Sequence, residues 1–126
     1  MVVGDSAFGF SGMEIETAAR YKLPLKVIII NNNGITQGND EIDPTGDPLT
    51  INANSLTPHG KYEMIAQAFG GKGVSVKDHA SLEKVLPEIL SDNNLWILNI
   101  YISPSAGRKA QEFSWLTREE APKAKL

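Results

Sequence analysis

The segment from Lys26 to Ile30 constrains the fold of this chain more than any other. Val27 to Ile30 are all β-branched and apolar, and no polar residue alternates with them. Such a short, continuous apolar run is typical of a central strand in a parallel sheet, where helices cover both faces. Because parallel neighbours need crossover connections, we expect helices between the strands.

The rest of the sequence alternates strand-like and helix-like segments around this run. Apolar residues recur at helical spacing in two further segments, and Gly70-Gly71 ends the first of them. The order predicts an α/β fold with a mostly parallel sheet flanked by helices. We expect strands at 1–3, 26–30, 74–76 and 95–102, and helices at 11–22, 62–69 and 82–90.

Two details of the helices can be predicted more closely. Ser11 and Glu14 have the spacing of a capping box, so the first helix is expected to begin at Ser11. Pro87 lies inside the last predicted helix and removes one backbone hydrogen bond, so a kink or an early end is expected there. The expected organisation is a domain over 1–102, incomplete at its N-terminus, followed by a tail over 103–126.

Composition excludes several classes of function. The chain has no cysteine, so disulfides and thiolate chemistry are excluded. Its formal net charge is −3 without a basic run, so nucleic acid is not an expected partner. The longest apolar run is far shorter than the roughly 20 residues of a membrane helix, so no membrane span is expected.

Candidate ligand-binding residues follow the first two predicted strands. Gly4-Asp5-Ser6-Ala7 follows the first, and Asn31-Asn32-Asn33-Gly34 follows the second, with Asp5 and Asn32 separated by 27 positions. In open α/β sheets, ligands bind beyond the carboxyl ends of the strands. Carboxylate, amide and backbone oxygens suit Mg²⁺, while the amides of Ser6 and Ala7 could cradle phosphate oxygens. Either segment alone is an ordinary turn, but the pair predicts a site for Mg²⁺ and a diphosphate.

The same residues resemble the fingerprint of thiamine-diphosphate-dependent enzymes, in which Gly-Asp-Gly precedes a helix, a strand and Asn-Asn. By position, Asp5 and Asn32 match the metal-ligating side chains, and Gly34 matches the backbone ligand. Ser6, Ala7 and Ile35 match residues that line the cofactor. Ser6 replaces the third motif glycine, as in the acyl-CoA branch of the family. Within that branch the sequence is most similar to 2-hydroxyacyl-CoA lyases, through GDSAFGFSGMEIET, NNNGI, YEMIAQAFGGKG and RKAQEFSWLTR.

This resemblance implies a reaction and an assembly. The enzymes cleave a 2-hydroxyacyl-CoA to formyl-CoA and an aldehyde one carbon shorter, a step of fatty acid alpha-oxidation. Their active site lies between subunits of a homodimer or homotetramer, and the glutamate that assists cofactor activation is on a separate pyrimidine-binding domain. We therefore assign no catalytic residue within 1–126. The alternatives are an oxalyl-CoA decarboxylase-like or acetolactate synthase-like enzyme, and a truncated, non-catalytic binding or assembly module.

The tail carries two further expectations. Arg108 and Lys109 are candidates to bind the phosphates of an acyl-CoA substrate, while Phe113 and Trp115 are candidates for a lid over the active site. A tail packed on its own domain or on another subunit is the alternative. The last residues, Ala124-Lys125-Leu126, resemble the Ser-Lys-Leu address that a peroxisomal import receptor reads. The expected location is therefore the peroxisome.

The remaining titratable residues are not expected to belong to a functional site. Glu14 and Glu16 are expected to be ordinary helix residues, and His59 and His79 to lie at the surface. A zinc site needs a cluster of nitrogen or sulfur ligands, and none is apparent in the sequence. A flavodoxin-like nucleotide-binding domain is a remoter alternative, without a GxGxxG motif or a P-loop lysine to support it.

Overall fold

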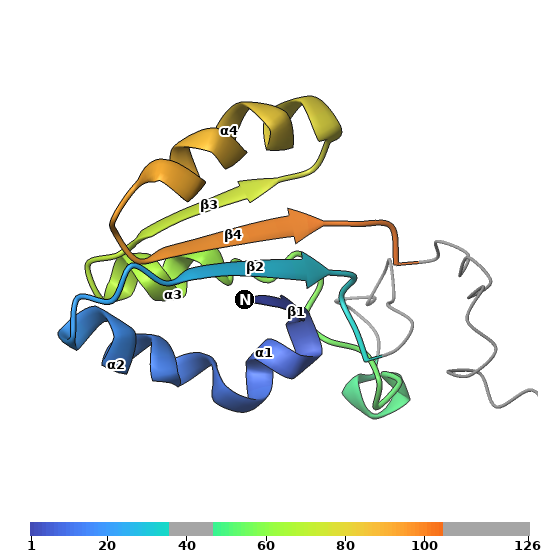
Figure 1. The fold of residues 1–126 in the computed structure, drawn as a ribbon. Coiled ribbons are helices and arrows are strands. Elements are labelled where there is room, and N and C mark those ends of the chain that lie inside the picture. The colour runs from blue at the N-terminus through green and yellow to red at the C-terminus, as the bar shows by residue number, and fades with distance from the viewer. Residues whose placement is uncertain (36–46, 105–126) are drawn as a thin grey trace, which may run out of the picture.

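The computed structural model of the chain describes residues 1–35 and 47–104. It forms an α/β domain in which four parallel strands make one sheet with the order β1-β2-β4-β3 (Figure 1). This confirms the predicted fold class and the predicted succession of strands and helices. In chain order the elements are β1 (Val2–Gly4), α1 (Asp5–Ser11), η1 (Gly12–Glu14), α2 (Ile15–Arg20), β2 (Lys26–Asn31), η2 (Pro48–Thr50), α3 (Glu63–Ala68), β3 (Lys72–Val76), α4 (His79–Ser91) and β4 (Trp96–Tyr101).

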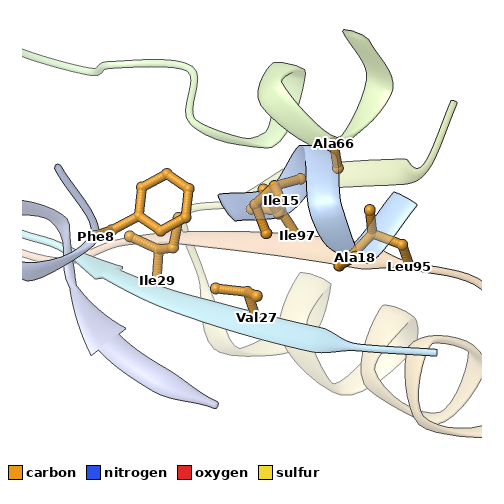
Figure 2. Packing of buried hydrophobic residues seen from close by; sticks show 8 residues of the cluster. All are labelled: Phe8, Ile15, Ala18, Val27, Ile29, Ala66, Leu95 and Ile97. Carbon is orange, nitrogen blue, oxygen red and sulfur yellow. The ribbon is translucent and has the colours of Figure 1, made fainter. Parts of the chain in front are cut away.

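Helices cover both faces of the sheet, as the apolar run in β2 requires. In Figure 1, α1, α2 and α3 lie on one side of the strands and α4 lies on the other. Figure 2 shows the larger apolar cluster between the sheet and the first three helices. Its buried members are Phe8, Ile15, Ala18, Val27, Ile29, Ala66, Leu95 and Ile97.

A second cluster packs beneath α4 on the opposite face. Its buried members are Val76, Ile89, Trp96 and Leu98. The two clusters therefore take alternate residues of β4, as expected from the twofold side-chain period of a strand. Asn99 continues the side of β4 that carries Ile97, and it pairs in register with Ile29 of β2. A polar residue thus stands where the apolar pattern calls for another hydrophobic one.

The predicted start of the first helix was wrong. The helix begins at Asp5, directly after the extended Gly4, whose φ and ψ are −75° and 159°. Ser11 is the last residue of α1, and its side chain makes no capping hydrogen bond. The capping-box pattern predicted the wrong start because the chain turns from β1 into α1 without a loop. A short η1 then separates α1 from α2.

Of the two outcomes expected at Pro87, a kink or an early end, the early end does not occur. Helix α4 continues through Pro87 as far as Ser91. Three of its apolar residues, Leu82, Val85 and Leu86, pack against the second cluster, and Ile89 is buried within it. Full burial of a side chain such as Ile89 contributes about 1.5–3 kcal/mol, and together with the three half-buried residues it offsets the roughly 3 kcal/mol that an interior proline costs.

A charged cluster ties β3 to the start of β4 at the amino end of the sheet. Asp92 accepts hydrogen bonds from the Lys72 ammonium at 2.7 Å and from the Trp96 indole N–H at 2.8 Å. These two donors, Lys72 first, hold the pKa of Asp92 well below its usual range.

We expect this pKa shift to make stability pH-dependent. The folded-state pKa of Asp92 is below that of the unfolded chain, about 3.9. The ionised Asp92 side chain therefore contributes its full stabilisation at pH values above the unfolded-state pKa, and this stabilisation is lost as the pH falls below that pKa. Unfolding midpoints measured between about pH 6 and about pH 3 should drop less steeply for Asp92→Asn than for the wild type. Parallel pH profiles for the two proteins would contradict this expectation.

Candidate functional site

The site begins with Asp5, which the turn from β1 into α1 places at the carboxyl end of the sheet (Figure 1). Asp5 is 1% exposed. Its Oδ1 accepts a hydrogen bond from the Ser6 amide at 3.0 Å. Its Oδ2 is buried and has no hydrogen-bond partner among the described residues. A buried carboxylate oxygen without a partner costs about 1–3 kcal/mol, so this oxygen is suited to an external ligand.

The pKa of Asp5 also indicates that its carboxylate is suited to an external ligand. Burial raises the pKa of the Asp5 carboxyl group, although the backbone amides of Ser6, Gly34 and Asn33 act in the opposite direction. The dominant influence is thus the loss of solvent around the charged form. A cation beside the carboxylate would compensate for that loss, and the charged form would then be favoured.

Strand register brings Asn32 and Gly34 beside Asp5. Gly4 pairs with Ile30 across the parallel β1–β2 ladder, so the residues after both strands meet at one edge. One terminal atom of the Asn32 amide lies 3.1 Å from Asp5 Oδ1 and 2.8 Å from the Gly34 carbonyl oxygen. As nitrogen, this atom donates a hydrogen bond to both oxygens. In the opposite orientation of the amide, this atom is the oxygen. It then accepts a hydrogen bond from the Gly34 amide at 3.3 Å and faces Asp5 Oδ1 and the Gly34 carbonyl oxygen.

The donor types around Asn32 fit a small divalent cation. Without a cation, the first orientation satisfies the amide, because its nitrogen donates to the Asp5 and Gly34 oxygens. To bind Mg²⁺, the amide would turn its oxygen toward these two groups, and the positive charge would offset the repulsion between the three oxygens. Mg²⁺ prefers hard oxygen ligands and usually takes one or two from the protein and the rest from phosphate and water. The carboxylate, amide and carbonyl oxygens of Asp5, Asn32 and Gly34 therefore fit Mg²⁺ by their chemistry.

The other predicted cofactor residues surround this group less closely. The Ser6 amide, which is predicted to contact a phosphate, donates to the Asp5 side chain at 3.0 Å. Ala7 is exposed in the first turn of α1. Ile35 is 43% exposed, and its amide donates to the Asn54 carbonyl at 2.8 Å. The tail residues Arg108, Lys109, Phe113, Trp115 and Ala124 to Leu126 lie outside the described residues.

Sequence reasoning missed a buried polar network beneath the site. It joins Asn31, at the end of β2, to Asn99 of β4 and to Glu63, the first residue of α3. Asn33 is also buried and has a positive φ of 62°. The signal was Asn99 itself, since a polar residue inside the apolar segment from Leu95 to Ile102 must find buried partners.

A cavity of about 290 Å³ opens at the carboxyl ends of β2 and β4. Asn33, which lies between the candidate ligands Asn32 and Gly34, forms part of its wall. Ser103 and Pro104, the first two residues of the tail, form another part. The tail therefore starts beside the candidate site.

His59 and His79 are exposed, as predicted. Glu14 lies in η1 and Glu16 in α2. Across 1–35 and 47–104, no cluster of three or more histidine, aspartate or glutamate side chains could hold a metal. In the same ranges, no helix is long and apolar enough to cross a bilayer. The candidate cation site differs from such a cluster because two of its three donors are an amide and a backbone carbonyl.

In open α/β sheets, ligands bind beyond the carboxyl ends of the strands, which is where Asp5, Asn32 and Gly34 converge. The sequence matches the family described as "Thiamine pyrophosphate enzyme, C-terminal TPP binding domain" over residues 1–100. The chain belongs to this family of thiamine-diphosphate-binding domains.

Individual relatives agree with this assignment. The chain is 46% identical to 2-hydroxyacyl-CoA lyase 1 of Homo sapiens over 125 residues, which cover 93% of the chain and 22% of the relative. It is 37% identical to oxalyl-CoA decarboxylase of Escherichia coli K12, covering 94% of the chain and 21% of the relative. The thiamine diphosphate-dependent 4-hydroxybenzoylformate decarboxylase of Rhodococcus jostii has the same fold, with a TM-score of 0.62 and 17% identity. The match covers 81% of this chain and 19% of the decarboxylase. The chain thus spans about a fifth of the length of these proteins.

Proposed function

We propose that this chain is the diphosphate- and Mg²⁺-binding part of a thiamine-diphosphate-dependent 2-hydroxyacyl-CoA lyase. The whole protein would cleave a 2-hydroxyacyl-CoA to formyl-CoA and an aldehyde one carbon shorter. The observation that carries this proposal is the convergence of Asp5, Asn32 and Gly34 at one edge of the sheet, where a buried Asp5 oxygen has no hydrogen-bond partner among the described residues. The 46% identity to human 2-hydroxyacyl-CoA lyase 1 favours the lyase reaction over the oxalyl-CoA decarboxylase alternative, at 37%.

Each residue of the site has a specific task in this proposal. Asp5 supplies an anionic oxygen, Asn32 an amide oxygen and Gly34 a carbonyl oxygen to Mg²⁺, and the diphosphate would supply further ligands. Ser6, Ala7 and Ile35 would line the cofactor. Thiamine diphosphate, when bound, supplies the carbanion-stabilising chemistry of the reaction. No residue of the chain is proposed as a catalytic acid or base, because that role would fall to a pyrimidine-binding domain of a partner subunit.

Calorimetry with thiamine diphosphate tests the cofactor proposal. Titrations of the whole protein with and without Mg²⁺ should show binding that requires the metal. Metal-independent binding of the same affinity would reject the role of the Asp5, Asn32 and Gly34 oxygens. Assays with two substrates then identify the reaction, because a lyase releases an aldehyde from 2-hydroxyacyl-CoA, whereas an oxalyl-CoA decarboxylase releases CO₂ from oxalyl-CoA.

The tail is proposed to act on the acyl-CoA substrate. Pro104 lines the cavity beside the site, and Arg108 is four residues further on. Four extended residues span up to about 14 Å, so the two cations of Arg108 and Lys109 are within reach of the carboxyl edge. They would bind CoA phosphates, while Phe113 and Trp115 would close over the substrate.

Charge reversal tests the role of the tail. The double substitution Arg108→Glu and Lys109→Glu should raise KM for acyl-CoA by about tenfold or more, because charge-assisted bonds to phosphate are lost. The affinity for thiamine diphosphate should not change. Lys84→Glu, on the exposed side of α4, is the matched control and should leave both constants unchanged. An unchanged KM in the double variant would rule out CoA binding by these residues.

We also propose that Ala124-Lys125-Leu126 directs the protein to the peroxisome through the import receptor. A fluorescent protein carrying the tail at its C-terminus should collect in peroxisomes. Removal of Leu126 should leave it in the cytosol, because the receptor reads the terminal tripeptide. Identical distributions of the two fusions would reject this address.

A further inference from the structure

The buried polar network beneath the site is made of side chains that do not belong to the proposed ligand set. Asn31, Asn99 and Glu63 are 1%, 0% and 8% exposed. Asn99 Nδ2 donates to Glu63 Oε2 at 2.8 Å and to the Gly60 carbonyl at 2.9 Å. Asn99 Oδ1 accepts from Asn31 Nδ2 at 3.2 Å. The Asn99 amide group is therefore fully engaged, and its orientation is fixed by its partners.

The network reaches the candidate ligands through Asn31. The Asn31 Oδ1 accepts a hydrogen bond from the Asn33 amide at 3.1 Å, which fixes the turn that contains Asn32. The Asn33 side chain is fixed in turn, since its Oδ1 accepts from the His59 amide at 2.9 Å. Asn33 has a φ of 62°, which asparagine adopts more readily than most residues with a side chain, and these two contacts hold it there. Asn32 and Gly34 thus flank a residue that is held from two directions.

The loop on the far side of the turn is attached to the same network. The Gly60 carbonyl accepts from Asn99 and also from the Tyr101 hydroxyl, at 3.3 Å. His59, which donates to Asn33, precedes Gly60 directly. Asn99 therefore contacts both groups that hold the turn. It accepts a hydrogen bond from Asn31 of β2 and donates one to the loop that carries His59.

We propose that Asn99 is a positioning residue for the metal site. Acting through Asn31 and the Gly60 loop, it holds the turn that carries Asn32 and Gly34 in place beside Asp5, where the two residues would bind Mg²⁺. The inference rests on the proposed function, because it presupposes that these oxygens bind the cation. Its physical basis is the demand of Mg²⁺ for near-ideal octahedral geometry, whereas Ca²⁺ accepts longer and more varied distances. A loosened turn should therefore weaken binding of Mg²⁺ more than binding of Ca²⁺.

A purely structural role for Asn99 predicts a different result. The network also fastens α3 to β4, and its loss would destabilise the fold. Destabilisation alone would lower the fraction of folded protein and reduce the apparent affinity for both metals by the same factor. The ratio of Mg²⁺ to Ca²⁺ affinity thus separates positioning from support of the fold.

The test uses Asn99→Asp in the whole protein. The carboxylate introduced by this substitution cannot donate a hydrogen bond, so it would be repelled by the Glu63 carboxylate and the Gly60 carbonyl. With thiamine diphosphate present, Mg²⁺ affinity should fall about 10- to 100-fold, as for changes to groups that orient metal ligands. Ca²⁺ affinity should fall by a smaller factor. The conservative Glu63→Gln, whose amide oxygen still accepts from Asn99, should bind Mg²⁺ like the wild type.

Rescue provides a second, independent readout. In the double variant Asn99→Asp with Glu63→Gln, the introduced amide can donate to the introduced carboxylate, and about tenfold of the lost Mg²⁺ affinity should return. Ile89→Val, a buried change in the other cluster, is the matched control for lost stability and should leave the metal ratio unchanged. If Asn99→Asp does not fold, Asn31→Asp removes the same contact with Asn99 and takes its place.

The outcomes separate this inference from the proposed function. A folded Asn99→Asp or Asn31→Asp variant with the wild-type ratio of Mg²⁺ to Ca²⁺ affinity would overturn the positioning role. A lowered ratio that is partly restored in the double variant would support it. If the wild-type protein itself binds thiamine diphosphate without any metal, the proposed function fails, and the positioning role fails with it.

Discussion

Asp5→Asn should abolish Mg²⁺-dependent binding of thiamine diphosphate while making the metal-free protein more stable. The substitution removes the single carboxylate of the proposed ligand set, so metal affinity should fall by about 100-fold or more, beyond the loss typical of residues that only orient ligands. Lyase turnover should be lost with it.

The gain in stability follows from the burial of Asp5. One carboxylate oxygen has no partner among the described residues, and burial raises the pKa of the group. A raised folded-state pKa means that the unfolded chain releases its proton first as the pH rises. The wild type therefore loses stability over the interval between the unfolded-state pKa and the folded-state pKa, and the loss persists at neutral pH. Asparagine carries no charge, so unfolding in the absence of metal should require about 1 kcal/mol more.

Calorimetry and denaturant unfolding together check both halves of this prediction. Glu14→Gln is the matched control, since it removes an exposed carboxylate from the same N-terminal region. It should change neither metal-dependent binding nor stability. If Asp5→Asn retained the wild-type affinity, Asp5 would not be a ligand. If the variant were less stable without metal, the carboxylate would have a partner that stabilises the fold.

Gly73→Ala should produce the largest loss of stability of any single methyl addition at the described glycines. A Cβ atom at this position would lie 2.1 Å from the Glu63 carbonyl oxygen, which belongs to the backbone of α3. Because backbone cannot rotate out of the way, α3 would have to move away from β3. Overpacking of this kind costs about 3 kcal/mol.

Gly9→Ala is the matched control for this substitution. It also adds one methyl group, but nothing lies within 4 Å of the new Cβ atom. Gly9 is inside α1, so alanine should stabilise the protein by up to about 1 kcal/mol through helix propensity. Measured by urea unfolding, the free energy of unfolding should be lower than that of the wild type for Gly73→Ala and higher for Gly9→Ala. Equal stability of Gly73→Ala and the wild type would mean that α3 is free to shift on the sheet.

The fold could be predicted from the sequence because its signals are local. The apolar run of β2 and the helical spacing of α3 and α4 are visible in windows of a few residues. The start of α1 could not be predicted, because the turn from Gly4 into Asp5 depends on the position of β1 in the sheet. Helix α4 begins at His79, three residues before the predicted start, because the Asp78 side chain caps it by accepting a hydrogen bond from the Ser81 amide.

The candidate site was only partly accessible to the same reasoning. The convergence of Asp5, Asn32 and Gly34 follows from strand order, since parallel neighbours end at the same edge. The roles of Asn99 and Glu63 depend on contacts between residues 36 positions apart, for which the sequence shows no periodic pattern. The use of the Ser6 amide by Asp5 is likewise a matter of side-chain rotamer, which the motif does not specify.

The strands of this domain separate two kinds of interaction along their length. The cluster of Lys72, Asp92 and Trp96 lies where β3 and β4 begin, and the oxygens proposed to bind the cation lie where β1 and β2 end. Substitutions at one end share no partner with those at the other, so their effects should add. Thermal tolerance can therefore be changed through the amino edge of the sheet, in evolution or in the laboratory, without altering the chemistry at the carboxyl edge.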